Sequence, residues 1–148
     1  MNIALFQPDI ALNVGAAMRL CACMGVGLDI IEPCGFAWNE KKIRSSALDY
    51  FDQITLTKHI SSEQFFDFYH AQGQRIVLMS TKASVPYTDF SFQDSDILMA
   101  GRESAGVPDT VHEQVDARVF IPMQAGFRSL NIVNATSMIL GEALRQTR

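Results

Sequence analysis

Long hydrophobic runs are absent from this sequence. Its longest uninterrupted apolar stretches have the length of a β-strand, far below the roughly 20 apolar residues that a membrane-spanning helix needs. No charged N-terminal segment precedes an apolar run, so the pattern of a secretory signal peptide is lacking as well. These two absences predict a cytoplasmic protein without membrane association.

Cysteine is scarce, with 3 residues in 148. Cys21 and Cys23 lie two positions apart in a segment of helical periodicity, where their side chains point in different directions. They therefore form neither a disulfide bridge nor a zinc chelate, and no metal site is expected. The three histidines, His59, His70 and His112, lie outside every motif described below, so no catalytic imidazole is assigned.

An excess of positive charge is also lacking, because 16 acidic residues outnumber 12 Lys and Arg residues and give a net charge of −4. This balance argues against a protein that coats nucleic acid, but a local basic patch still permits RNA binding. The densest basic cluster is Lys41, Lys42 and Arg44, on a short helix that Asn39 caps. These cations either form a solvated helix face or contact RNA phosphates, and the sequence leaves both readings open.

Apolar segments of strand length alternate with segments of helical periodicity along the chain. With 48% hydrophobic residues, 148 residues suffice for one core, so a single domain spanning residues 1–148 is expected. The pattern predicts an α/β fold with three layers and a mainly parallel six-stranded sheet. The expected strands cover residues 2–6, 28–31, 54–57, 75–80, 96–100 and 118–121.

Polar caps mark the expected helices. Asn13 is expected to cap a first helix that ends at Gly25, and Ser61 with Gln64 forms a capping box. The helix that follows Asn131 carries two apolar stripes, so burial on nearly all sides is expected. The glycines of the first βαβ unit lack the spacing of the dinucleotide-binding fingerprint, which argues against a Rossmann cofactor site.

Loops with unusual chemistry leave the carboxyl ends of the expected strands, where parallel α/β sheets bind ligands. They are residues 80–82, 101–106 and 121–129, joined by the start of the first helix with Asn13 and Arg19. Gly101 and Gly106 let the backbone approach a ligand, although two glycines also suit a plain turn. Ser129 and Asn131 precede a helix whose first N–H groups are free, so they suit either an anion-binding site or an ordinary cap.

Three of these segments resemble, in order, the motifs of the SPOUT superfamily of RNA 2′-O-methyltransferases. Motif one is matched by Asn13-Val-Gly15 with Arg19-Leu-Cys21, motif two by Leu98-Met-Ala-Gly-Arg-Glu103 with Gly106 and Pro108, and motif three by Ile121-Pro-Met123 with Arg128-Ser-Leu-Asn131 and Asn134-Ala135. Residues 30–38 and 48–50 further resemble the TrmL-type tRNA (cytidine/uridine-34 2′-O)-methyltransferases. The resemblance covers nearly the whole chain.

The resemblance implies a C-terminal trefoil knot, which periodicity alone does not indicate, and a homodimer whose active sites use both subunits. The implied reaction moves a methyl group from S-adenosyl-L-methionine to the ribose 2′-hydroxyl of cytidine or uridine at the tRNA wobble position, nucleotide 34, in tRNA-Leu isoacceptors. S-adenosyl-L-homocysteine is the implied product. The alternatives are a 2′-O-methyltransferase of another tRNA position or of rRNA, and a non-catalytic RNA-binding module of the same fold.

The resemblance also implies residue roles. Arg19 is the catalytic residue, acting either as a base or, because guanidinium pKa values exceed about 12, as a planar group that orients the ribose. The groups arranged about it are Asn13, Glu103, Ser129 and Asn131, and the cofactor-binding positions are Met79, Gly101, Ile121, Met123, Ser129 and Leu130. The cations expected to contact RNA are Lys41, Lys42, Arg44, Arg102 and Arg128. Two plainer readings stay open: Glu103 pairs only with Arg102, and Asn13 is only a helix cap.

Overall fold

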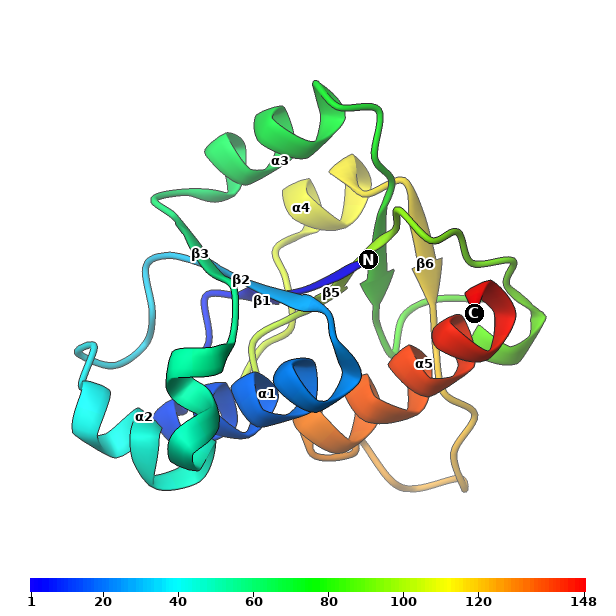
Figure 1. Cartoon of the computed structure of the whole chain (residues 1–148). Coiled ribbons are helices and arrows are strands. Elements are labelled where there is room, and N and C mark those ends of the chain that lie inside the picture. Colours follow the sequence, from blue (N-terminus) through cyan, green and yellow to red (C-terminus); the bar gives the residue numbers. More distant parts are fainter.

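The computed structural model describes residues 1–148 and contains one parallel sheet with helices on both faces (Figure 1). The strands are β1 (Asn2–Phe6), β2 (Gly27–Ile31), β3 (Leu56–His59), β4 (Ile76–Met79), β5 (Ile97–Ala100) and β6 (Ala117–Val119). The helices are α1 (Ala11–Met24), α2 (Glu40–Ala47), α3 (Ser62–His70), α4 (Asp109–Gln114) and α5 (Ile132–Thr147), with short 3-10 turns η1 (Leu48–Gln53) and η2 (Tyr87–Asp89).

The six strands follow the order β3-β2-β1-β5-β4-β6, and every neighbouring pair is parallel. Helices α1, α2 and α5 cover one face of the sheet, whereas α3 and α4 cover the other (Figure 1). The predicted three-layer α/β fold is therefore confirmed, with a sheet that is entirely rather than mainly parallel.

The first strand, β1, lies in the middle of the sheet. Leu5 pairs with Ile30 of β2 on one side and with Ala100 of β5 on the other. Successive side chains of a strand point to opposite faces, so Leu5 joins the core beneath α1 and α5 while Phe6 joins the core beneath α3 and α4. Burial on both faces explains why this strand reads as a continuous apolar run.

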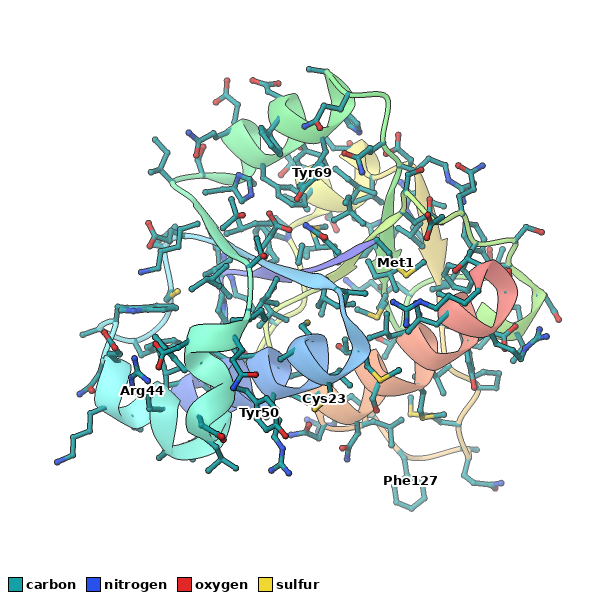
Figure 2. All side chains as sticks on the ribbon, viewed as in Figure 1. Met1, Cys23, Arg44, Tyr50, Tyr69 and Phe127 are labelled. Atoms are coloured by element: carbon teal, nitrogen blue, oxygen red, sulfur yellow. The ribbon has the colours of Figure 1, made fainter.

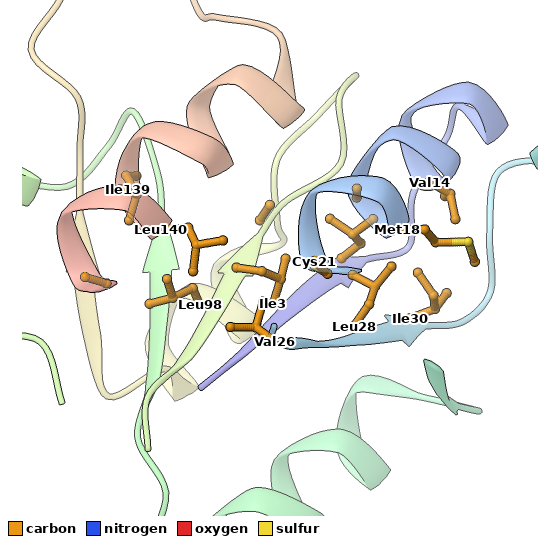
Figure 3. Close-up of a cluster of buried hydrophobic side chains, with 14 of the residues drawn as sticks. Ile3, Val14, Met18, Cys21, Val26, Leu28, Ile30, Leu98, Ile139 and Leu140 are labelled. Carbon is orange, nitrogen blue, oxygen red and sulfur yellow. The ribbon is translucent and has the colours of Figure 1, made fainter. Parts of the chain in front are cut away.

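The larger core lies between the sheet and the α1/α5 layer. Figure 3 shows Met18 and Cys21 of α1 and Leu140 of α5 meeting sheet residues such as Leu28 and Leu98. All five side chains are at most 1% exposed. The smaller core, on the opposite face, is built on aromatic side chains of α3 and apolar side chains of α4.

Helix α1 begins earlier than the sequence indicated. Its N-cap is Ile10, which makes no side-chain cap hydrogen bond, and Asn13 lies within the first turn. The expectation that Asn13 caps this helix is wrong, because the chain enters it from Pro8 through a segment that is fixed by other loops. The expected end is confirmed, since Gly25 adopts the left-handed conformation with φ 70°.

Other caps agree with the sequence. Asn39 accepts a hydrogen bond from the backbone N of Lys42 at 3.1 Å, and Ser61 accepts one from the N of Gln64 at 3.1 Å. Asn131 caps α5 by accepting from the N atoms of Val133 and Asn134. These polar side chains satisfy backbone donors that have no partner within the helix.

Several boundaries differ from the expected ones. The expected strand 54–57 forms two residues later as β3 (Leu56–His59), and the expected strand 118–121 is β6 (Ala117–Val119). The strand expected over 75–80 is the shorter β4 (Ile76–Met79), and α4 and both 3-10 turns were not expected. Elements this short contain too few apolar residues to show the helical or strand periodicity from which an element is predicted.

Helix α5 is buried on one side only. Ile139, Leu140 and Ala143 are at most 1% exposed, whereas Met138 is 41% exposed. The expected burial on nearly all sides is therefore not found in the single chain, because the helix face that carries Met138 remains accessible. None of the helices combines the length and apolar character that a membrane crossing requires.

Candidate active site

A cavity of about 430 Å³ opens at the carboxyl ends of β4, β5 and β6. Its walls come from residues 78–82, 100–107, 119–121 and 128–132, with Met123, Asn13 from α1 and Ile139 from α5 among the other contributing residues. Leu78, Val119 and Ile139 supply buried apolar surface, while Glu103 and Asn131 supply polar groups. A cavity with this mixed lining suits a ligand that has both a flat apolar part and a charged part.

The loop after β5 folds back on itself. Arg102 and Gly106 exchange two backbone hydrogen bonds of 2.9 Å each. A Cβ atom on Gly101 would lie 2.8 Å from the Cα of Gly106, so no larger residue fits there without a shift of the backbone. The two glycines thus form a tight turn and also present an unobstructed backbone to the cavity.

Glu103 lies in this turn and faces the segment between β1 and α1. Its Oε2 atom accepts from the backbone N of Asp9 at 2.8 Å, and its Oε1 atom accepts from Nδ2 of Asn13 at 3.3 Å. The reading in which Glu103 pairs only with Arg102 is therefore wrong, and the reading of Asn13 as only a helix cap is wrong as well. The structure connects motif one to motif two through these side chains.

Asn131 extends the connection to motif three. Its Nδ2 atom donates to Oδ1 of Asn13 at 3.4 Å while its own Oδ1 atom caps α5. Three residues that the sequence nominated, Asn13, Glu103 and Asn131, thus form one chain of hydrogen bonds beside the cavity. Ser129, the fourth of the surrounding group, also lines the cavity.

All six positions expected to bind the cofactor line the cavity; they are Met79, Gly101, Ile121, Met123, Ser129 and Leu130. Met123 and Leu130 keep 37% and 41% of their surface exposed, so an added flat ligand has apolar side chains to cover. Figure 2 shows that Phe127, which is 76% exposed, projects away from the body of the molecule in the same loop.

Arg19 is not among the residues that line the cavity. It is exposed on α1, with its guanidinium carbon 5.9 Å from the ring centroid of Tyr50 on η1. The single chain therefore does not bring Arg19 together with the Glu103 group.

The basic cluster on α2 divides into free and paired cations. Lys41 and Lys42 are exposed. Arg44, in contrast, donates to both carboxylate oxygens of Asp52 and to Glu40. These hydrogen bonds raise the pKa of Arg44 and lower that of Asp52, so this arginine is held by its own helix and η1.

Two cavity residues near the loop after β5 have unusual surroundings. Arg102 donates to Oε1 of Gln7, and its guanidinium carbon lies 5.4 Å from the ring centroid of Phe6. His112 was not predicted from the sequence, yet it lines the cavity and accepts from Nε of Arg118 at 3.1 Å through Nδ1. No sequence signal pointed to His112, because it lies on the short helix α4. No three His, Cys, Asp or Glu side chains are grouped to hold a metal ion.

Comparison with known sequences identifies relatives over nearly the whole chain. The profile of the SpoU rRNA Methylase family matches residues 1–141. A protein of Beijerinckia indica named tRNA (cytidine(34)-2′-O)-methyltransferase is 54% identical over 144 residues, covering 97% of this chain and 90% of the relative. A protein of the same name from Escherichia coli K12 is 38% identical over 148 residues, covering 99% and 93%.

Solved structures agree. A structure that concerns the 2-OH methylation of C/U34 on tRNA superimposes with a TM-score of 0.92 at 32% identity, covering 98% of this chain and 94% of that chain. The SpoU methyltransferase AviRb of Streptomyces viridochromogenes, in complex with the cofactor AdoMet, superimposes with a TM-score of 0.89 at 25% identity, covering 99% and 60%. The resemblance inferred from the three motifs is confirmed, and the chain belongs to the SpoU rRNA methylase family.

Proposed function

We propose that this protein methylates the ribose 2′-hydroxyl of cytidine or uridine at nucleotide 34 of tRNA. The observation that carries the proposal is the hydrogen-bonded chain of Glu103, Asn13 and Asn131 beside the cavity. It joins the three motifs at the carboxyl edge of the sheet, and relatives that match this chain end to end are named for this reaction. The proposed substrates are tRNA-Leu isoacceptors in the cytoplasm.

The lining of the cavity fits S-adenosyl-L-methionine. Gly101 permits the tight turn whose backbone lines the cavity, and the apolar side chains of Met123 and Leu130 can cover a purine ring. When bound, this cofactor supplies an electrophilic methyl group on a sulfonium, leaving S-adenosyl-L-homocysteine. The buried apolar side chains of Leu78, Val119 and Ile139 in the cavity wall favour a reaction in which charge is neutralised.

The side chains beside the cavity orient the reacting groups. The carboxylate of Glu103 accepts from Asn13 and so fixes which side of that amide is the donor. Ser129, in the loop before Asn131, adds a hydroxyl to the cavity wall. Correct alignment of a hydroxyl nucleophile contributes a large part of the rate in such transfers.

We assign to Arg19 the orientation of the ribose and its phosphate, because a guanidinium stays protonated and presents a planar set of donors. Since Arg19 does not line the cavity of its own chain, we propose that it serves the cavity of a second copy in a homodimer. Exposed apolar side chains on α1, η1 and α5, namely Leu12, Leu48 and Met138, support such an interface.

The family membership also supports a single-domain enzyme over residues 1–148 with a C-terminal trefoil knot. Cations at the cavity and on α2 suit the tRNA backbone: Arg102 and Arg128 line the cavity, and Lys41 and Lys42 are exposed. Arg44 is the weakest of the proposed RNA contacts, since acidic partners occupy its guanidinium.

A second candidate is 2′-O-methylation of rRNA, because the matching family is described by rRNA methylation. Methyl transfer from labelled S-adenosylmethionine to total tRNA and to rRNA, followed by mass spectrometry of nuclease fragments, tests both. We expect one added methyl group at nucleotide 34, and none on tRNA that already carries a 2′-O-methyl there. A label at another tRNA position or in rRNA contradicts the proposal, and RNA binding without transfer identifies a non-catalytic module.

A further inference from the structure

Asp9 connects two loops of the candidate site without lining the cavity itself. It lies in the segment of residues 7–10 between β1 and α1, and its carboxylate faces the turn after β5. Its Oδ2 atom accepts from Oγ of Ser104 at 2.5 Å and from the backbone N of Ser104 at 3.2 Å. Its own backbone N donates to Oε2 of Glu103 at 2.8 Å. One residue thus holds two consecutive positions of the turn.

Other contacts fix the segment that carries Asp9. Gln7 begins it with φ 43°, a left-handed conformation that non-glycine residues rarely adopt, and its N donates to the carbonyl of Ile31 at 2.8 Å. The side chain of Gln7 accepts from Arg102. Gly35 donates to the carbonyl of Pro8 at 2.9 Å. A residue keeps such a rare backbone conformation only where the contacts around it hold it there. Residues of this kind cluster at functional sites.

Gly35 also sets the place of the Asp9 side chain. A Cβ atom on Gly35 would lie 2.6 Å from Oδ1 of Asp9 and 3.1 Å from its Cα atom. The loop after β2 therefore packs its backbone directly against Asp9 at Oδ1, whereas Ser104 is bonded to Oδ2. Three loops, those after β1, β2 and β5, meet at this aspartate.

We propose that Asp9 is a positioning residue that holds Glu103 for methyl transfer; this inference rests on the proposed function. Glu103 has one carboxylate oxygen on Asp9 and the other on Asn13, so it cannot rotate without breaking one of these bonds. Because Nδ2 of Asn13 donates to Glu103, the position of Glu103 decides the orientation of the Asn13 amide. The Oδ1 atom of Asn13 then accepts from Asn131. Asp9 does not line the cavity itself and contributes through Glu103 and Ser104, which do.

The test compares Asp9→Ala, Asp9→Asn and Ser104→Ala, with Asp94→Ala as the matched control in an exposed loop. Asp9→Ala keeps the backbone N–H that donates to Glu103 but removes both side-chain contacts with Ser104, the next residue of the turn. We expect it to lower kcat by about tenfold to a hundredfold, because small misplacements of catalytic groups have effects of this size. The Kd for S-adenosylmethionine, from calorimetry, should change less than about threefold. Asp9→Asn keeps an acceptor for Ser104, so its kcat should be close to that of the wild-type protein. Ser104→Ala should lower kcat less than Asp9→Ala does.

A double-mutant cycle separates positioning from general stability. In a Glu103→Ala background, Asp9→Ala should cause no further loss of kcat, because the residue it positions is gone. Equal losses in both backgrounds, or an unchanged kcat in Asp9→Ala, would overturn the proposal. If Asp9→Ala does not fold, Ser104→Ala replaces it in the double-mutant cycle with Glu103→Ala, and the expected loss of kcat is smaller.

Hydrogen–deuterium exchange distinguishes this inference from the proposed function. Backbone amides of residues 101–107 should exchange faster in Asp9→Ala than in wild-type protein or in Asp94→Ala. A wild-type protein that methylates no RNA would refute the proposed function, yet faster exchange in this turn would still support the contact made by Asp9. Unchanged exchange in Asp9→Ala refutes the positioning role whatever the enzyme acts on.

Discussion

The Nδ2 atom of Asn131 lies 3.4 Å from the Oδ1 atom of Asn13, across 118 positions of the sequence. The Oδ1 atom of Asn131 accepts from the start of α5, and Nδ2 of Asn13 donates to Glu103. Each amide therefore has only one orientation that satisfies both of its neighbours. The helix cap and the candidate active site share a side chain, and the reading of Asn131 as a helix cap is confirmed.

Asn131→Asp separates these two roles. An aspartate keeps the acceptor for the cap and adds favourable negative charge at a helix N-terminus, but it cannot donate to Asn13. We expect an unchanged or higher melting temperature with a loss of kcat. Asn131→Ala should lose kcat and about 1 kcal/mol of unfolding free energy together. Full activity in Asn131→Asp would show that the bond to Asn13 is dispensable.

Arg19 is expected to act on the cavity of a second copy. Arg19→Ala should keep the affinity for S-adenosylmethionine and lose most turnover, because the residue does not line its own cavity. Mixing Arg19→Ala with Glu103→Ala subunits creates heterodimers with one intact site. A random mixture should recover about a quarter of the wild-type rate, as expected for a symmetric dimer in which half the pairs are mixed. No recovery would place Arg19 and Glu103 in the same chain's site.

Gly101→Ala should abolish cofactor binding. The added methyl group meets the backbone of Gly106 at 2.8 Å, so the turn that lines the cavity has to move. Gly141→Ala adds the same group on α5 where nothing lies within 4 Å. This control should bind the cofactor normally and gain about 1 kcal/mol of unfolding free energy from helix propensity. Calorimetric titration and urea unfolding measure both quantities, and normal binding by Gly101→Ala would contradict the proposed site.

Charge reversal should distinguish the free cations on α2 from the paired one. Lys41→Glu with Lys42→Glu is expected to raise the KM for tRNA several-fold more than the KM for the cofactor, and to weaken the dependence of binding on salt. Arg44→Glu should instead lower the melting temperature, because Glu40 and Asp52 lose their shared partner. An unchanged KM for tRNA in the double lysine variant would return these side chains to a solvated face.

Stability at alkaline pH should depend on Cys21. Burial, reinforced by the negative charge of Asp29, raises the pKa of its thiol from 9.0 to about 12. The unfolded chain loses this proton above pH 9.0, whereas the folded chain keeps it until about pH 12, so the unfolding free energy falls with rising pH in this interval.

Urea unfolding at a series of alkaline pH values measures this slope. Cys21→Ala should show a shallower decline than wild-type protein, and Cys23→Ala, at an exposed position, should show the wild-type slope. Native protein should be alkylated at Cys23 and protected at Cys21. Rapid alkylation of native Cys21 would contradict its burial.

The sequence predicted most of the fold because buried parallel strands leave a strong signal. Residues 2–6 are apolar on both faces, so their expected bounds agree with β1. β3 was placed two residues early, since its half-buried residues give no clear apolar run. The start of α1 was missed because Ile10 makes no cap hydrogen bond and a polar Asn13 offered a stronger but false signal.

The sequence predicted which loops form the candidate site, because each of these loops directly follows the end of an expected strand. Parallel strands bring those ends together, so Gly101 and Ser129 were correctly expected to share one cavity. The partner of Glu103 was not predictable, because Asp9 has no motif and its role depends on how three loops pack. Arg19 lies outside the cavity of its own chain, and the proposal that a second copy uses it concerns an arrangement of two chains, which residue spacing within one sequence does not describe.

The central place of β1 in the sheet also has a consequence for synthesis of the protein. Its pairing with β2 involves neighbours in sequence, but its other edge pairs with Ile97–Ala100. A nascent chain on the ribosome therefore keeps that edge uncovered until Ile97–Ala100 has been translated. During this interval an exposed apolar edge invites pairing with other chains, so chaperone contact is expected to concentrate on β1.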